Sequence, residues 1–393
     1  MNKNNIIDFG LQPVSNRFTN KQNDKVPHFK LEVYWNEEVG CPAIKTPWPV
    51  KYIKPKYEWL TCFEPEDHLD ELCEIILNLN KNKSNITFAG YSFKDDSTLL
   101  RFENFGFKNT WRIDPKKDLL IEDKLSNIET FQKVFNEDIA KKIAKKNGCV
   151  DVLIVRHVIE HAYNLTEFIN SLKLLINDNG HIVFELPDCK KAFENGDCTT
   201  IWEEHTFYFF ESSFKRCLLK HNLEIIFWKN WDYPLENCMV AIVKKHSQNI
   251  NKINFSNYDQ DLYIYQNFLK KVKYRKNIIF KILYNFSQKH GKICILGAGH
   301  LSVAFISLLG LKDLISFVVD DNENKANYFL PIGKIPIKKT RFLDIKSAKL
   351  CLLGANPQHH KKIKNNLSTF EEDGGKICSI FPNTLNYLED ILK

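Results

Sequence analysis

Short apolar runs alternate with amphipathic segments between residues 85 and 245, and this alternation restricts the fold more than any other feature. The runs read NITFAGY, NTWRIDP, VDVLIVRHVIEH, GHIVFELPD, LEIIFWKN and CMVAIVKK, and segments such as LTEFINSLKLLIND separate several of them. A regular exchange of strand and helix predicts a doubly wound α/β sheet. Ligands of such sheets bind beyond the carboxyl ends of the strands, so polar residues at those ends are candidate site residues.

A second alternation follows towards the C-terminus. KICILGAGHLSVAFISLLGL predicts a buried strand, a glycine turn and an apolar helix, and ISFVVDDN, AKLCLLGAN and GKICSIFP predict further strands. A chain of 393 residues is too long for one compact core. We therefore predict an α/β protein with two Rossmann-like doubly wound domains, 81–247 and 291–393. A helical linker at 248–290 joins them, and a small irregular module occupies 1–80.

Charge and hydropathy exclude several classes of protein. The net charge of +7 is spread over a long chain, and the lysines form short clusters typical of solvated helix faces. No basic groove interleaved with aromatic residues is evident, so we expect no nucleic-acid partner. No apolar run approaches the ~20 residues that span a bilayer, and the N-terminus lacks a signal-peptide pattern. We therefore expect no membrane partner and a cytoplasmic location.

The eleven cysteines form no C-x-x-C pair. A zinc ribbon or a redox dithiol needs such pairs, and an odd number of cysteines also argues against a disulfide framework. In a reducing compartment these residues are expected to be small, buried and apolar in character.

Two glycine turns are typical of nucleotide-binding folds, in which glycine lets the backbone approach the ligand and an acid after the second strand binds the ribose. The first turn offers Gly90, followed by Asp114 in RIDP. It has one glycine where such loops usually have two or three, and a strand-end Asp is also a common turn former. The second turn offers Gly297 and Gly299, with Asp320 ending the next strand. A tight structural turn explains it about as well.

Two further stretches place histidine beside carboxylates. RHVIEHAYN ends the third strand of the central domain and puts His157, Glu160 and His161 at the ligand edge, although they could equally cap the next helix. TIWEEHTFYFF sets Glu204 and His205 inside an aromatic run. It is either an amphipathic element with its charges in water or an acid/base group at the wall of a pocket. The stretch alone does not decide between them.

The order of the motifs resembles the sugar C-methyltransferase family. The motifs are DFGLQPVSNRF, RIDP, VDVLIVRHVIEH, GHIVFELPD, EEHTFYFF, CILGAGHLS and VVDDNENKANYFLPIGKIPI, which together extend over nearly the whole chain. The resemblance implies a Rossmann-like methyltransferase domain that uses S-adenosylmethionine and a C-terminal Rossmann-like domain that helps to hold a nucleotide-linked keto sugar. The family also has an N-terminal zinc module. Its paired cysteines are absent here, so we predict no metal.

The family carries a Tyr-x-Glu-His element with an acid/base role at the sugar. The resemblance implies that His205 is the base and that Glu204 is its partner, which orients the ring. Trp202 occupies the position of the family's Tyr, and an indole N–H cannot shuttle a proton. Tyr208 lies nearby and is the candidate replacement.

The resemblance also implies two binding regions. The family's Gly-Ser-Asn-Asp-Gly-like cofactor turn is altered here, with Asp95-Asp96-Ser97 before a pair of leucines. The residues expected near the cofactor are Gly90, Asp96, Asp114, His157 and His161. The residues expected near the substrate are Trp202, Gly297, Gly299, His300 and Asp320.

The leading prediction is a methyltransferase that uses S-adenosylmethionine to methylate a nucleotide-activated keto sugar at carbon, in a monomer or homodimer. The strongest rival is an epimerase or isomerase, because removal of a proton beside a ketone without methyl transfer gives that reaction, and the altered cofactor turn favours it. A third reading is a sugar-nucleotide binding protein that has lost turnover.

Overall fold

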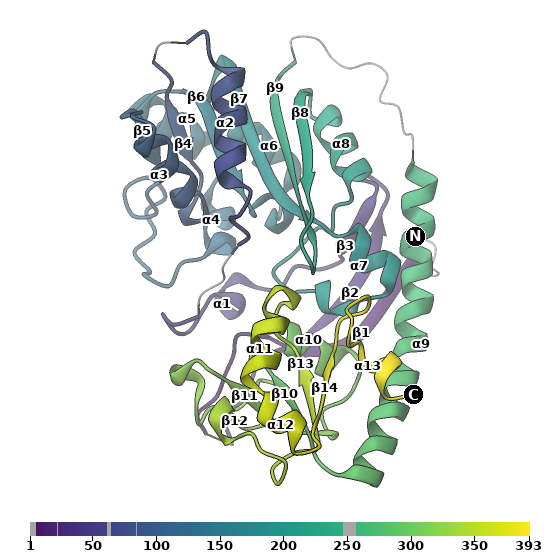
Figure 1. Cartoon of the computed structure of the whole chain (residues 1–393). Coiled ribbons are helices and arrows are strands. Elements are labelled where there is room, and N and C mark those ends of the chain that lie inside the picture. Colours follow the sequence, from purple (N-terminus) through teal and green to yellow (C-terminus); the bar gives the residue numbers. More distant parts are fainter. Residues whose placement is uncertain (1–4, 22, 61–63, 84, 247–256) are drawn as a thin grey trace.

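The computed structural model describes residues 5–21, 23–60, 64–83, 85–246 and 257–393, and Figure 1 shows their arrangement. These residues form three β-sheets of three, six and five strands. The two larger sheets are flanked by helices, so the prediction of an α/β fold is confirmed. No helix among the described residues is both long enough and apolar enough to cross a membrane.

The six-stranded sheet follows the alternation seen in the sequence. Its order is β5-β4-β6-β7-β9-β8, parallel from β5 to β7, with β9 antiparallel to both β7 and β8. The strands are β4 (Phe88–Gly90), β5 (Thr110–Arg112), β6 (Val150–Arg156), β7 (Ile176–Asp188), β8 (Leu223–Trp231) and β9 (Asn237–Lys245). The run VDVLIVR becomes β6, which is almost wholly buried, as expected for a central parallel strand covered on both faces.

Helices cover both faces of this sheet, which makes it doubly wound (Figure 1). Apolar side chains of α2 and α3 pack on one face, and those of α4, α5, α6 and α8 pack on the other. The helices are α2 (Leu69–Leu79), α3 (Asp96–Asn104), α4 (Ile128–Val134), α5 (Glu137–Asn147), α6 (Leu165–Lys173), α7 (Lys190–Asn195) and α8 (Glu211–Lys220). Short 3-10 turns are η2 (Phe93–Asp95), η3 (Ile159–His161) and η4 (Cys198–Thr200).

The five-stranded sheet is parallel throughout, in the order β12-β11-β10-β13-β14. Its strands are β10 (Ile293–Leu296), β11 (Ile315–Asp320), β12 (Ile337–Lys339), β13 (Leu350–Leu353) and β14 (Lys376–Ser379). Its helices are α10 (His300–Leu308), α11 (His360–Asn366), α12 (Ser368–Glu372) and α13 (Leu388–Ile391), with η5 (Glu323–Lys325), η6 (Thr340–Phe342) and η7 (Pro357–His359) between them.

The N-terminal segment is more regular than the sequence predicted. It forms an antiparallel sheet of β1 (Ile6–Pro13), β2 (His28–Asn36) and β3 (Cys41–Ile44), followed by the single turn α1 (Val50–Ile53). Its buried residues share one core with the five-stranded sheet and with α9 (Tyr258–His290). The predicted domain boundary at residue 80 would assign α2 to the N-terminal module, whereas α2 packs on the six-stranded sheet.

Helix α9 has 33 residues, and many of them are buried against the rest of the protein. The sequence predicted only a helical linker here. Its buried face includes Tyr265, whose hydroxyl donates to the carbonyl of Val33 at 2.9 Å. Asp261 near its start binds the guanidinium of Arg216 from α8 at 2.7 Å. The helix therefore contacts all three sheet-containing parts of the molecule. Residues 248–256 of the predicted linker lie outside the described residues.

Candidate active site

The stretch TIWEEHTFYFF forms a buried loop between η4 and α8. The amide of Tyr208 donates to the carbonyl of Pro42 at 2.9 Å, and the amide of Ile44 donates to the carbonyl of Thr206 at 2.9 Å. The amide of Thr206 in turn donates to the carbonyl of Glu160 at 2.8 Å. The loop is thus fixed between β3 and η3. Of the two sequence-based readings, the structure excludes a solvated amphipathic element, because Glu203 and Glu204 are only 7% and 8% exposed.

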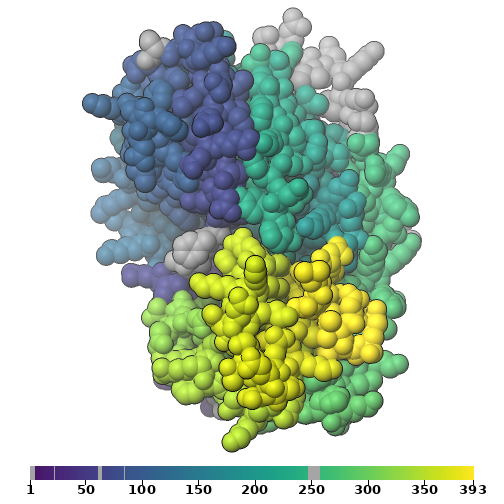
Figure 2. Space-filling model, in the orientation of Figure 1, coloured from purple at the N-terminus to yellow at the C-terminus, as the bar shows by residue number. Residues whose placement is uncertain are grey.

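His205 lines a cavity of about 240 Å³, which we call the histidine cavity because His157 and His300 also line it. Part of its wall lies near the carboxyl ends of β6 and β7 and in the turn between β8 and β9, and part comes from the C-terminal unit, which is built on the five-stranded sheet. The residues from the C-terminal unit are His300, Leu301, Asn356 and Gln358. In Figure 2 the yellow-green C-terminal atoms pack directly against the blue and teal ones above them.

A second cavity of about 390 Å³, the tryptophan cavity, is lined by Trp59 and Trp202. The other lining residues include Glu204, Gly299, Lys325 and His300. Trp202 and His300 line both cavities and stack with ring centroids 4.5 Å apart and an interplanar angle of 18°. This stacked pair is therefore the partition between them. The two cavities bring together Trp202, His205, Gly299 and His300, which the sequence placed in different domains.

His205 is held in contact with other rings. Its ring centroid lies 4.8 Å from that of His161 and 5.1 Å from that of Trp202. Burial, together with the nearby His161 and Lys94, holds the pKa of His205 well below its usual value. The imidazole is consequently neutral at physiological pH and able to accept a proton.

The expectation that Glu204 orients the ring of His205 is corrected. No hydrogen bond joins them among the described residues; Glu204 instead accepts a long one, 3.4 Å, from the amide nitrogen of Asn16. Burial, followed by the repulsion of Glu129 and Glu203, raises the pKa of Glu204 well above its usual value. The neighbouring imidazole of His161 does have a carboxylate partner, because its Nδ1 lies 2.5 Å from Oε1 of Glu129.

The role expected for Tyr208 is also corrected. Its hydroxyl donates to the carbonyl of Trp202 at 3.0 Å and accepts from the amide of the same residue at 3.2 Å. Both contacts are local, and burial raises the pKa of Tyr208 well above its usual value. The side chain therefore shapes the loop that carries Trp202, and its proton is not available to a ligand.

We expect Tyr208→Phe to lower stability by about 1 kcal/mol, the usual net value of a lost hydrogen bond, while retaining most of the activity. Urea unfolding and steady-state kinetics measure the two effects. A loss of activity of more than about 100-fold in a folded variant would restore Tyr208 as a catalytic residue.

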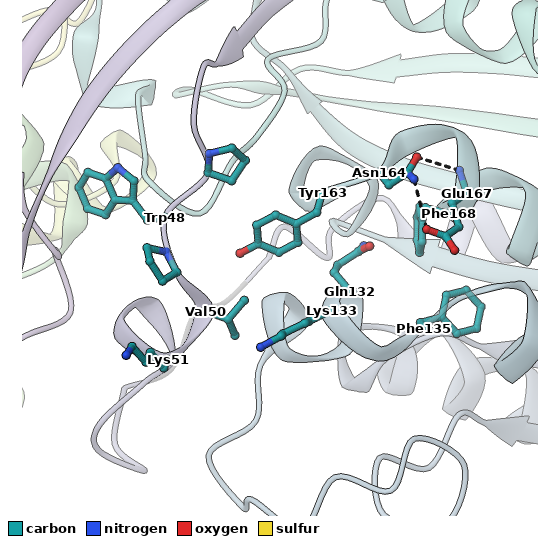
Figure 3. A pocket seen from close by; sticks show the side chains of 12 residues that line it. Trp48, Val50, Lys51, Gln132, Lys133, Phe135, Tyr163, Asn164, Glu167 and Phe168 are labelled. Carbon is teal, nitrogen blue, oxygen red and sulfur yellow. Dashed lines mark hydrogen bonds between the residues drawn. The ribbon is translucent and has the colours of Figure 1, made fainter.

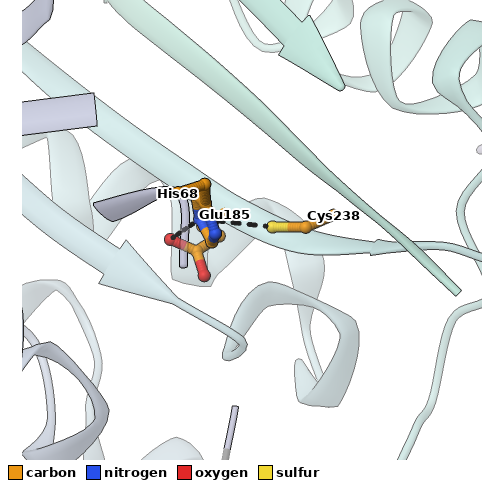
Figure 4. Close-up of side chains that lie close together, drawn as sticks. All are labelled: His68, Glu185 and Cys238. Carbon is orange, nitrogen blue, oxygen red and sulfur yellow. Dashed lines mark hydrogen bonds and ion pairs between the residues drawn. The ribbon is translucent and has the colours of Figure 1, made fainter. Parts of the chain in front are cut away.

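A network of buried charges lies at the carboxyl end of β6. Glu185 of β7 accepts from Nε of Arg156 at 2.8 Å and lies 3.2 Å from Nε2 of His157. Its other neighbour, His68, lies 3.3 Å away and also contacts the thiol of Cys238 at 3.6 Å (Figure 4). Sequence reasoning missed Glu185. The available signal was a carboxylate within the apolar strand run GHIVFELPD.

His157 belongs to this network and has a positive φ of 49°, a strained conformation for a residue with a side chain. Burial alone would lower its pKa, but Glu64, Glu160 and Glu185 raise the pKa of His157 well above the usual value. His157 is therefore an imidazolium that faces the histidine cavity. Neither carboxylate oxygen of Glu160 has a hydrogen-bond partner among the described residues, although its side chain is buried and lines the same cavity.

The turn after β4, which the sequence offered at Gly90 as a candidate nucleotide-binding turn, is occupied by side chains of the turn itself. A Cβ added at Gly90 would lie 2.9 Å from Cβ of Asp95, so the glycine makes room for this side chain. Tyr91 is fully buried against Phe135 and other rings. Burial raises the pKa of Asp95 to about 7. In this conformation the turn is filled by its own side chains.

The other predicted cofactor residues are dispersed. Asp96 pairs with Arg112 at 2.7 Å. Asp114 accepts hydrogen bonds from the amides of Lys116 and Lys117, at 2.9 and 2.8 Å, which is the behaviour of a turn former. Of the predicted set, His157 lines the histidine cavity and His161 lies behind His205.

The turn after β10 was predicted to lie near the substrate, and one of its residues lines a cavity. Gly299 lines the tryptophan cavity, and a Cβ added there would meet no atom within 4 Å. Gly297 has φ of 105° and lies against the backbone of Ala355, which no larger residue would allow. Asp320 accepts from the amide of Ala298 at 2.7 Å and binds Lys325 at 3.1 Å, so its oxygens serve the turn itself.

A third cavity, of about 590 Å³, lies between the N-terminal segment and helices α4 and α6 (Figure 3). Trp48 and Lys51 line it from one side and Lys133, Tyr163 and Phe168 from the other. None of the residues predicted from the sequence lines it.

Comparison with known proteins supports a methyltransferase. Residues 94–226 match the family model described as a methyltransferase domain, and residues 243–382 match the C-methyltransferase C-terminal domain. A curated relative, C-methyltransferase NovU of Streptomyces niveus, is 24% identical over 114 residues, which are 29% of this chain. The alignment covers 27% of that relative's length.

Two solved methyltransferase structures have low similarity to this chain. One is an S-adenosylmethionine-dependent enzyme from Clostridium acetobutylicum, with a TM-score of 0.31 and 9% identity over 47% of this chain and 94% of that chain. Another is the 1,6-didemethyltoxoflavin-N1-methyltransferase of Burkholderia thailandensis, with a TM-score of 0.30 and 9% identity over 46% of this chain and 80% of that chain. The two family matches confirm the prediction of a methyltransferase, and the methyltransferase-domain match supports S-adenosylmethionine as its cofactor.

Proposed function

The chain belongs to the methyltransferases that carry a C-methyltransferase C-terminal domain, and on this premise we propose that it methylates a carbon atom of a nucleotide-linked keto sugar. The observation that carries the proposal is the position of His205. Its neutral imidazole lines a cavity whose wall comes partly from the unit built on the six-stranded sheet and partly from the C-terminal unit.

His205 would act as the base. It takes the proton from the carbon next to the ketone, and the electron pair of the C–H bond is delocalised to the oxygen as an enolate. His157 lines the same cavity as a cation, and its positive charge favours the negative charge that develops on the substrate. The neutral His205 can therefore accept the proton, and the cationic His157 can stabilise the enolate.

S-adenosylmethionine, when bound, supplies an electrophilic methyl group to the enolate carbon. The buried carboxylate of Glu160 would hold its cationic end in the histidine cavity. It accepts no hydrogen bond among the described residues, and its Oε1 lies 3.6 Å from Nδ1 of His157. Glu64 lines the same cavity. The residues predicted near the cofactor, Gly90, Asp96, Asp114, His157 and His161, remain a prediction.

We expect Glu160→Gln to weaken the binding of S-adenosylmethionine about tenfold or more, since a charge-assisted hydrogen bond is worth roughly 1.5–3 kcal/mol. Isothermal titration calorimetry on the purified protein measures this. Glu167→Gln, an exposed carboxylate in the first turn of α6, is the matched control. Unchanged affinity in Glu160→Gln would remove Glu160 from the cofactor site.

The tryptophan cavity fits the nucleotide part of the substrate. Trp59 and Phe18 offer ring faces for a base, Lys325 offers a cation for phosphate, and Gly299 leaves open space beside the start of α10. The stacked Trp202 and His300 lie between this cavity and His205. A substrate that extends across the pair would present its sugar to His205 and its nucleotide to the C-terminal unit.

The test of the proposed function is direct. The purified protein is incubated with S-adenosylmethionine and a panel of nucleotide-linked keto sugars, and products are analysed by mass spectrometry and carbon NMR. The proposal expects one added methyl group on a ring carbon. Methylation at oxygen or nitrogen, or no methylation of any panel member, would reject it.

One observation favours a second function, epimerisation or isomerisation. The turn after β4 is filled by Asp95 and Tyr91, which leaves little room for a cofactor in this conformation. The same base would then return the proton to the substrate. Uptake of solvent deuterium into a keto-sugar nucleotide, without cofactor and without methylation, would identify this reaction.

A further inference from the structure

We propose that His161, Glu129 and Glu204 form a buried proton-accepting group behind His205, which receives the proton that His205 removes from the substrate. The inference rests on the proposed function of His205. It concerns residues behind the wall of the histidine cavity, since His161 is 2% exposed and Glu129 is 1% exposed.

His161 is held as an acceptor towards His205. Its Nδ1 lies 2.5 Å from Oε1 of Glu129, so the proton on Nδ1 is directed to this carboxylate. Its Nε2 is buried and has no hydrogen-bond partner among the described residues. The rings of His161 and His205 meet edge to face, with centroids 4.8 Å apart and an interplanar angle of 86°.

Glu129 is itself fixed in place. It lies in the first turn of α4, and the side-chain amide of Asn127 at the helix start donates to its second oxygen. One ligand-type atom from each of Glu129, His161 and Glu204 lies within 4.8 Å of the other two. The raised pKa of Glu204 in this arrangement follows from burial next to Glu129. Two adjacent buried carboxyl groups that share negative charge readily accept a proton.

The proton would move in two steps that leave the number of protons and electrons unchanged. His205 binds the proton from the substrate carbon and passes it to Nε2 of His161. The proton on Nδ1 of His161 then moves to Glu129, which shares it with Glu204. His205 is restored to its neutral form while the enolate is still in the cavity, so the proton is not returned to the carbon before it is methylated.

Nitrogen-15 NMR of the histidines tests the inference without any substrate. In the full-length protein at neutral pH we expect His161, assigned through His161→Gln, to carry its proton on Nδ1 and to have a bare Nε2. A proton on Nε2 would overturn the inference. Stoichiometric zinc, iron or manganese that is lost in His161→Gln would also overturn it, because Nε2 would then be a metal ligand.

Kinetics of Glu129→Gln supply the second readout. We expect kcat to fall at least about tenfold with KM unchanged, because the carboxylate acts through His161 and not on the substrate. Glu129→Asp should recover part of the rate, and Glu137→Gln, a carboxylate in the first turn of the neighbouring α5, is the control. Wild-type kcat in Glu129→Gln would overturn the inference. If the wild type itself shows no methyl transfer, the proposed function fails and the NMR result alone decides.

Discussion

His205→Ala is expected to reduce kcat by about 10²–10⁴-fold, the usual contribution of a general base, while the protein stays folded. The imidazole makes ring contacts but no side-chain hydrogen bond among the described residues, so its removal breaks no buried hydrogen bond. Rates of methyl transfer measure the effect, and circular dichroism checks the fold. His290→Ala, an exposed histidine at the end of α9, is the control. A variant that keeps a tenth of the wild-type rate would end the assignment.

The pH dependence of the wild type tests the same assignment. His205 acts as a base only when it is unprotonated, and its pKa is held well below 6.5 by burial and by the nearby His161 and Lys94. We therefore expect no loss of kcat/KM from His205 between pH 8 and pH 6.5, and a loss only at pH values well below 6.5. A decline centred at 6.5 or above would point to an exposed histidine instead.

The sequence predicted the parts of this site that depend on local pattern. Apolar runs became strands, and the polar residues after them, such as His157, fell at the carboxyl edge of the six-stranded sheet. For the aromatic loop around His205 the sequence left two readings open, a solvated element and a pocket wall, and the burial of Glu203 and Glu204 in the structure decided between them.

The pairing of carboxylates with histidines was not predictable, because it depends on packing between distant segments. Glu129 and His161 are 32 residues apart and meet because α4 lies over η3, whereas Glu204 is adjacent to His205 in sequence but points to another partner. The filled turn after β4 was missed for the same reason. The sequence shows that Gly90 is followed by Tyr91, but it does not show that this ring enters the core.

The N-terminal sheet was missed for a different reason. Strand β1 pairs with β2 through an irregular register between Asp8 and Leu11, and Pro42 interrupts the short β3, so neither has the clean alternation that predicts a strand. Its stability comes instead from the shared core with α9 and the five-stranded sheet.

Glu185→Gln is expected to lower the free energy of unfolding by about 3–5 kcal/mol, the cost of removing one member of a buried ion pair. Glu185 is 0% exposed and is the carboxylate that contacts Arg156, His157 and His68, at 2.8, 3.2 and 3.3 Å. Without its charge, Arg156 and the imidazolium of His157 would face each other in the interior. Urea unfolding at pH 7, followed by tryptophan fluorescence, measures the difference.

The effect of Glu185→Gln should depend on pH in a defined direction. Burial alone would raise the pKa of Glu185, but Arg156, His157 and His68 hold it well below the usual value of 4.5. A carboxylate with a lowered pKa in the folded state contributes stability above the pKa of the unfolded state, and this contribution is lost as the pH falls through the folded pKa. The difference in unfolding free energy between wild type and variant should therefore be full above pH 5 and should narrow only below about pH 4.5.

The control is Glu224→Gln, which changes an exposed carboxylate on β8 paired with Lys244. It should show no comparable difference from wild type either at pH 7 or below about pH 4.5. A difference below about 1 kcal/mol at pH 7 would mean that the charge of Glu185 is not what holds Arg156 in the interior.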